Sequence, residues 1–241
     1  MGTLYAAEGH VGPCEVKVPA SHLTGSEEAR ARFHREVEML RSLRHPGIVR
    51  VLAAGEERGH CWYALEPMSA PDLGTRLDRV NALPFPEVEQ LASQLLDALG
   101  AAHDAGLVHG DVRPQNILLA QGGVKLTNFG LSLVPPGAHD YQAPEQRQWG
   151  RAVTQSDLHS LGRVLHEALT GGSPETQPLP KGVPRHLRRL LRALHSEAIQ
   201  DRPDSAISAR RLLTQRTPLG PWAVGIAALL ALVLFLLLRV A

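Results

Sequence analysis

The sequence contains little cysteine and few aromatic residues, and its charges nearly cancel. Its two cysteines, Cys14 and Cys61, cannot supply a disulfide framework or a four-thiolate metal site, so a disulfide-stapled secreted module is excluded. The 25 Lys and Arg residues against 24 Asp and Glu give a formal net charge of +1, which argues against nucleic acid as a partner. Residues 1–9 lack a basic segment followed by an apolar one, so no secretory signal peptide is predicted.

Enough apolar material is present for a folded core. Hydrophobic residues make up 44% of the 241 residues and charged residues 20%, which is far from the composition of a disordered chain. The length predicts one or two domains. The sequence shows no internal repeat and no low-complexity tract.

The C-terminal end carries one long uncharged run. No charged side chain occurs from Trp222 to Leu238, and residues 219–221 extend the run to twenty. Twenty helical residues at about 1.5 Å each span a hydrocarbon core of about 30 Å. We expect a transmembrane helix over residues 219–239 after a linker at 213–218; a buried soluble helix is the alternative. Nine Lys and Arg against three Asp and Glu between Lys181 and Arg216 place residues 1–216 on the cytoplasmic side.

The rest of the chain divides into a strand-rich part and a helical part. Residues 1–68 hold short β-branched or aromatic runs at 3–6, 15–18, 48–52 and 61–65, with one amphipathic helix expected from Ser26 to Leu43. From residue 69 onward helical periodicity dominates, at 86–103, 155–169 and 184–195. A small strand-rich lobe therefore precedes a larger helical lobe.

Six ordered motifs point to one family. His-Gly-Asp-Val-Arg-Pro-Gln-Asn at 109–116 is followed by a short apolar strand and by Asn-Phe-Gly at 128–130; Ala-Pro-Glu at 143–145 and a helical segment at 156–162 come next. Val-Lys-Val at 16–18 and Arg-Glu-Val at 35–37 precede them. This order resembles that of eukaryotic-type protein kinases, in the style of the bacterial membrane-bound serine/threonine kinases. For such a protein the expected location is the bacterial inner membrane.

The resemblance implies an α+β, two-lobed fold. The N-lobe would be residues 1–68 and the C-lobe residues 69–212. Residues 1–6 resemble the end of the family's glycine-rich loop, so we expect the N-lobe to lack the first strand. A start codon upstream of Met1 would account for that departure as an alternative.

The resemblance also implies roles for particular residues. Asp111 would accept the hydrogen bond of the attacking hydroxyl, Arg113 would supply charge near the transferred phosphate, and Lys17 would be held by Glu36. ATP and magnesium are the cofactors implied for an active enzyme. Their expected ligands are Gly2, Leu4, Lys17, Glu66 and Met68 for the nucleotide, and Asn116 and Asn128 for the metal. Arg202 would pair with Glu145.

Three departures fall where nucleotide and metal would bind. Asn128 replaces the aspartate of Asp-Phe-Gly, which removes a negative ligand from the metal. Glu15 stands at the position of a small residue over the adenine ring, where a carboxylate would crowd the base; an outward-turned Glu15 after local strand slippage is the alternative. The first glycines are absent as well. Gly110 replaces an arginine that often pairs with a phosphorylated activation loop, so control by such phosphorylation is not expected.

We therefore predict a membrane-anchored kinase-like domain that is catalytically impaired and acts by binding protein partners. The first alternative is an active serine/threonine kinase that uses Asp111, and the second is a small-molecule phosphotransferase on a related fold. The spacing of the twelve histidines indicates no metal site, and Cys14 and Cys61 are expected to be inert packing residues.

Overall fold

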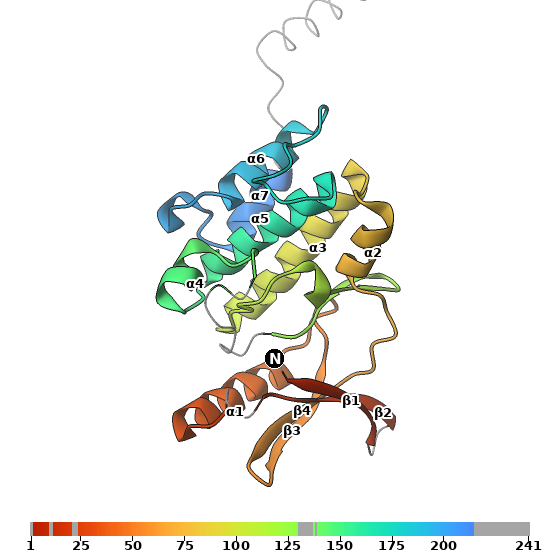
Figure 1. The fold of residues 1–241 in the computed structure, drawn as a ribbon, viewed down its shortest axis with the longest axis vertical. Helices are drawn as coiled ribbons and strands as arrows, with labels where there is room; N and C mark the ends of the chain where they lie inside the picture. The colour runs from red at the N-terminus through yellow and green to blue at the C-terminus, as the bar shows by residue number, and fades with distance from the viewer. Residues whose placement is uncertain (1, 10–11, 21–23, 130–136, 138, 215–241) are drawn as a thin grey trace, which may run out of the picture.

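The computed structural model describes residues 2–9, 12–20, 24–129, 137 and 139–214, which form two lobes (Figure 1). The smaller lobe holds a four-stranded sheet and one helix, and the larger lobe is mainly helical. The two-lobed α+β architecture predicted from the sequence is confirmed.

The sheet of the N-lobe is antiparallel with strand order β1-β2-β4-β3. Its strands are β1 (Thr3–Gly9), β2 (Gly12–Val18), β3 (Val51–Glu57) and β4 (His60–Leu65). A strand over Ile48–Leu52 was expected, but β3 begins later, at Val51. The reason is that Ile48 forms an isolated bridge with Leu126 of the other lobe, and the Val49 N–H donates to the Leu126 carbonyl at 2.9 Å.

Helix α1 (Glu27–Ser42) matches the amphipathic helix expected in this lobe. The Ser26 side chain accepts a hydrogen bond from the Ala29 N–H at 3.1 Å, which satisfies one open donor of the first turn. Phe33, Val37 and Leu40 recur at helical spacing and are buried, so one face of α1 is apolar. The helix packs with that face on β3 and β4.

The C-lobe is built around two long helices, α3 (Phe85–Asp104) and α5 (Thr154–Thr170), which pack on each other. The other elements are α2 (Leu73–Val80), η2 (Pro114–Asn116), β5 (Ile117–Ala120), β6 (Gly123–Leu126), α4 (Pro144–Trp149), α6 (Arg185–Leu194), η3 (Ile199–Asp201) and α7 (Ala206–Thr214). The helices predicted at 86–103, 155–169 and 184–195 correspond to α3, α5 and α6.

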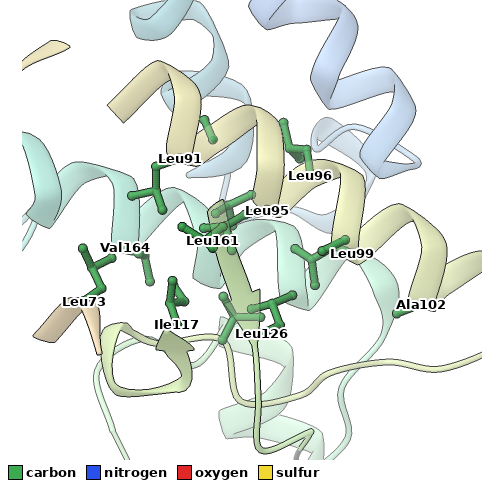
Figure 2. Close-up of a cluster of buried hydrophobic side chains, with 14 of the residues drawn as sticks. Leu73, Leu91, Leu95, Leu96, Leu99, Ala102, Ile117, Leu126, Leu161 and Val164 are labelled. Atoms are coloured by element: carbon green, nitrogen blue, oxygen red, sulfur yellow. The ribbon is translucent and has the colours of Figure 1, made fainter. Parts of the chain in front are cut away.

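The C-lobe core lies under the β5–β6 hairpin. Figure 2 shows Leu95 and Leu99 of α3 and Leu161 of α5 gathered around Ile117 and Leu126 of the hairpin. These side chains are all buried. Because the hairpin follows directly on residues 109–116, this core holds that loop against the helices.

The predicted transmembrane helix at 219–239 and the end of the linker at 213–218 lie outside the described residues. Among the residues that the structure does describe, none of the helices has the length and apolarity needed to cross a membrane.

Candidate active site

One buried carboxylate of α5 holds the loop that leads to Asp111. The side chain of Asp157 accepts hydrogen bonds from the backbone N–H groups of His109, at 2.8 Å, and Gly110, at 2.7 Å. Gly110 has φ of 74°, in the left-handed region that favours glycine. The His109 ring packs on Phe129 with ring centroids 4.4 Å apart. Through Asp157, helix α5 thus anchors the loop that carries Asp111.

Asp111 is buried and is contacted on both carboxylate oxygens. Asn116 Nδ2 donates to Asp111 Oδ2 at 2.8 Å, while His139 Nε2 lies 2.7 Å from Oδ1 and Arg113 Nε lies 3.4 Å from the same oxygen. Burial by itself would raise the pKa of Asp111, but the hydrogen bond with His139 and the charge of Arg113 outweigh burial and lower it. Asp111 is therefore ionised at neutral pH, and side chains of the same protein already engage both of its oxygens.

A line of hydrogen bonds joins the two lobes through Asn128. Lys17 Nζ of β2 donates to Asn128 Oδ1 at 2.8 Å, and Asn128 Nδ2 donates to Asn116 Oδ1 at 3.0 Å. Asn128 has φ of 57°, a left-handed conformation that asparagine and aspartate tolerate better than most residues. The structure therefore brings together Lys17, Asn116, Asn128, Asp111 and Arg113, as the sequence motifs suggested.

The fourth expected catalytic residue, Glu36, is not joined to Lys17. No ion pair between Lys17 and Glu36 occurs within the described part of the chain, and the Lys17 ammonium is directed to Asn128 instead. Burial lowers the pKa of Lys17 to about 8; the Asp111 charge opposes this effect and the Arg113 charge adds to it. Lys17 thus occupies a site that disfavours its charged form.

We expect the reaction of Lys17 with a small amine-reactive reagent to show a pH midpoint near 8, well below the ordinary lysine value of 10.5. The cause is that only the neutral amine reacts, and burial populates that form at lower pH. Peptide mass spectrometry after labelling at a series of pH values measures the midpoint. Lys125 and Lys181, the other two lysines of the chain, report the behaviour of the reagent. A Lys17 midpoint close to 10.5 would contradict the expected environment.

The positions expected to hold the nucleotide base contain internal contacts. Glu15 Oε1 accepts a hydrogen bond from the Met68 N–H at 3.4 Å, in the segment that joins the lobes. Glu66 forms an ion pair with Lys125 and also accepts from the Arg50 N–H. The Glu15 carboxylate is thus turned toward the inter-lobe segment, and the alternative of an outward-turned side chain is wrong.

The remaining nucleotide candidates lie on or before β1. Leu4 faces Lys17 in the β1–β2 register and is 52% exposed. Gly2 lies so close to the other strand that a Cβ atom would meet the Val18 carbonyl oxygen at 2.0 Å. A glycine is therefore needed at this close approach of the backbone.

The described residues do not fit a magnesium site of the kind that the family resemblance implies. Magnesium prefers hard oxygen ligands, usually with one or two carboxylates among them. Asn116 and Asn128 offer neutral amide oxygens, and each of these oxygens already accepts a hydrogen bond, from Asn128 and Lys17 respectively. A cation bound to Asn128 would also meet the Lys17 ammonium. No magnesium-dependent step follows from this arrangement.

A buried ion pair stabilises the segment after the site. Arg202 Nη1 and Nη2 lie 2.7 and 3.0 Å from the two carboxylate oxygens of Glu145, and Ser156 donates to the same carboxylate at 2.6 Å. Both charged side chains are almost fully buried, with 0% and 3% of their surface exposed. The partnership of Arg202 with Glu145, which the family resemblance implied, is confirmed.

Comparison with known proteins identifies the family in which this arrangement of residues occurs. The model of the protein kinase domain matches residues 16–212, which begin within β2 and extend into α7. The chain belongs to the protein kinase domain family. Its bacterial relatives include the serine/threonine-protein kinase PkaB of Streptomyces coelicolor, 30% identical over 95% of this chain and 62% of that protein. PknL of Mycobacterium tuberculosis is 34% identical over 68% of this chain and 44% of that kinase.

Solved structures give the same assignment for the fold. The kinase domain of Mycobacterium tuberculosis PknI superimposes with a TM-score of 0.73 at 28% identity, over 88% of this chain and 90% of that structure. The present chain spans less than two thirds of the length of the curated relatives PkaB and PknL.

Two features of this kinase domain were not foreseen from the sequence. The first is His139, which contacts Asp111, and the second is the Met68 N–H as the partner of Glu15. The only sequence signal for His139 is its position between Asn128 and Glu145, the segment that passes the catalytic loop in kinases. Residues 130–136 and 138 of that segment, including Ser132, lie outside the described residues.

Proposed function

We propose that this protein is a membrane-anchored, catalytically impaired member of the serine/threonine kinase family that acts in signalling by binding protein partners. The observation that carries the proposal is the engagement of Asn128 with Lys17 and Asn116. In an active kinase these positions hold metal and phosphate. Here a neutral amide takes the lysine ammonium as its own hydrogen-bond partner, so charge that would bind phosphate is used within the protein.

The base-binding side supports the same proposal. The Glu15 carboxylate accepts the hydrogen bond of the Met68 N–H, and a nucleotide base entering beside that backbone would have to displace a charged group. A carboxylate at this position also repels the negative triphosphate. Nucleotide binding is therefore opposed by both hydrogen bonding and charge.

The residue that would orient the phosphate-accepting hydroxyl, Asp111, is also in contact with another side chain of the protein. His139 Nε2 lies 2.7 Å from Asp111 Oδ1, at hydrogen-bond distance from the oxygen that would orient an attacking hydroxyl. A substrate hydroxyl could reach that oxygen only after the imidazole moved. The fold is thus retained while the positions for metal, base and acceptor are each engaged by side chains of the protein.

A working serine/threonine kinase is the second candidate, because Lys17, Asp111 and Asn116 all lie in one cluster. The two candidates differ in a direct assay. We expect the full chain in mild detergent, with magnesium and radiolabelled ATP, to transfer no more phosphate to itself or to a basic acceptor protein than its Asp111→Asn variant does. Circular dichroism of both proteins verifies that they are folded. Transfer by the unsubstituted chain that Asp111→Asn abolishes would establish the active kinase instead.

Membrane anchoring rests on the uncharged run at 219–239 and on the positive charge that precedes it. We expect the full chain expressed in bacteria to sediment with inner membranes and to resist alkaline extraction, whereas a chain ending at residue 216 should not. The two lobes should be protected from protease in intact spheroplasts, as befits a cytoplasmic domain. Full-length protein released by alkaline carbonate would contradict the anchor.

A further inference from the structure

Three side chains with metal-ligating atoms meet in the N-lobe, away from the candidate active site. His34 Nε2 lies 3.3 Å from Glu56 Oε2 and 4.0 Å from Cys61 Sγ, and the three ligand atoms all lie within 4.8 Å of one another. None of these residues takes part in the Lys17–Asn128–Asp111 constellation. The cluster is therefore a separate feature of the N-lobe.

The fold positions each of the three side chains by a separate constraint. Glu56 and Cys61 are directly opposite each other in the β3–β4 register, so the hairpin alone places two ligands side by side. His34 comes from α1, where the neighbouring Phe33 is fully buried and contacts the His34 ring edge-to-face at a centroid distance of 5.5 Å. The imidazole is thereby held over the hairpin before any ligand binds.

The two distances from His34 Nε2 are close to those of a tetrahedral zinc centre. With Zn–N of about 2.0 Å, Zn–O of about 2.0 Å and Zn–S of about 2.3 Å, tetrahedral ligand atoms lie about 3.3–3.6 Å apart. The His34–Glu56 separation of 3.3 Å already has this value, and the His34–Cys61 separation of 4.0 Å would need to close by only a few tenths of an ångström. One imidazole, one carboxylate and one thiolate also balance the charge of a divalent ion.

We propose that His34, Glu56 and Cys61 bind a divalent transition-metal ion, with zinc as the ion that suits this donor set. Three protein ligands leave a fourth position for water. Solvent has access to the site because the side chains of His34 and Glu56 are 41% and 37% exposed, whereas the sulfur comes from a buried residue. Mixed nitrogen, oxygen and sulfur ligation favours zinc over magnesium or calcium, which take oxygen ligands.

Metal binding at this site would fasten α1 to the β3–β4 hairpin. Glu36 lies two residues after His34 on the same helix, so the ion would restrict the element that carries an expected catalytic residue. The metal site does not depend on whether the protein transfers phosphate, and it can be tested without any activity assay.

The test uses the full chain in mild detergent, reduced and with its purification tag removed. We expect one equivalent of Zn²⁺ to bind in competition with a chromophoric chelator, and Co²⁺ to give the near-ultraviolet charge-transfer band of a cobalt–thiolate bond. Cys61→Ser should abolish the band, and His34→Ala and Glu56→Gln should each weaken zinc binding by about tenfold or more. Cys14→Ser and His60→Ala are matched controls from the same sheet and should leave both readouts unchanged.

The variants also distinguish binding at this cluster from binding elsewhere in the chain. Glu56→Gln and His34→Ala alter partly exposed side chains, so they remain informative if Cys61→Ser, at a buried position, unfolds the lobe. Zinc binding that these two variants leave unchanged would overturn the proposal, because the metal would then be held by other histidines of the chain. Absence of stoichiometric zinc binding to the folded, reduced protein would overturn it equally.

Discussion

Replacing Arg202 with alanine is expected to lower the free energy of unfolding by about 3–5 kcal/mol, because the Glu145 carboxylate would be left buried without its cation. Arg202 contacts both carboxylate oxygens of Glu145 and also donates to the backbone carbonyls of Gln155, Ser196 and Glu197. The substitution would thus break a junction among α4, α5 and the segment before α7. Since domains are stable by only about 5–15 kcal/mol, the effect is large.

Chemical denaturation of the full chain in detergent, followed by circular dichroism, measures the loss. The matched control is Arg210→Ala, which removes an ion pair to Asp97 of similar length, 2.7 Å, between side chains that are 47% and 50% exposed. That change should cost less than about 1 kcal/mol, because water screens an exposed pair. Equal losses for the two variants would contradict the structural role assigned to the buried pair.

Combining Asn128→Asp with Glu15→Ala is expected to produce magnesium-dependent ATP binding that the unsubstituted chain lacks. The first change adds an anionic ligand at a position whose backbone conformation, φ of 57°, aspartate tolerates. The second removes the carboxylate that accepts the Met68 N–H. Together they reverse two of the three departures that oppose the nucleotide and its metal.

A thermal-shift titration with ATP, with and without magnesium, measures this gain. At about 100 times the dissociation constant a ligand stabilises the folded state by about 2.7 kcal/mol, which raises the melting temperature of a domain of this size by about 5–10 °C. Asn128→Ala is the control for the first position, because it removes both hydrogen bonds of the amide and adds no charge. Glu15→Gln separates the charge of the second position from its size.

Each outcome of the titration identifies which residues prevent nucleotide binding. Binding by the double variant alone, and only with magnesium, is the expected result. A similar shift for the unsubstituted chain would contradict the proposed impairment. No shift for a folded double variant would mean that features other than Asn128 and Glu15 prevent nucleotide binding.

Much of this architecture follows from local sequence. The periodicity of Phe33, Val37 and Leu40 determines a helix with one buried face, and Ser26 caps its start, because these effects act between residues three or four positions apart. The resemblance of the motifs to those of protein kinases likewise implied the two lobes, the loop before β5 and the partnership of Glu145 with Arg202. Local patterns failed for the strand at 48–52, since its first residues pair with the other lobe.

The contacts that distinguish this protein depend on how the folded chain packs. His139 reaches Asp111 across 28 residues, Glu15 reaches Met68 across 53, and His34 reaches Cys61 across 27. No periodicity links residues so far apart, because such contacts depend on how helices and strands pack and on which rotamers the packing leaves open. The family and the departures at Asn128 and Glu15 could thus be read from the order and identity of the residues. The packing of the lobes determines which side chains contact the residues at the positions for metal, base and acceptor.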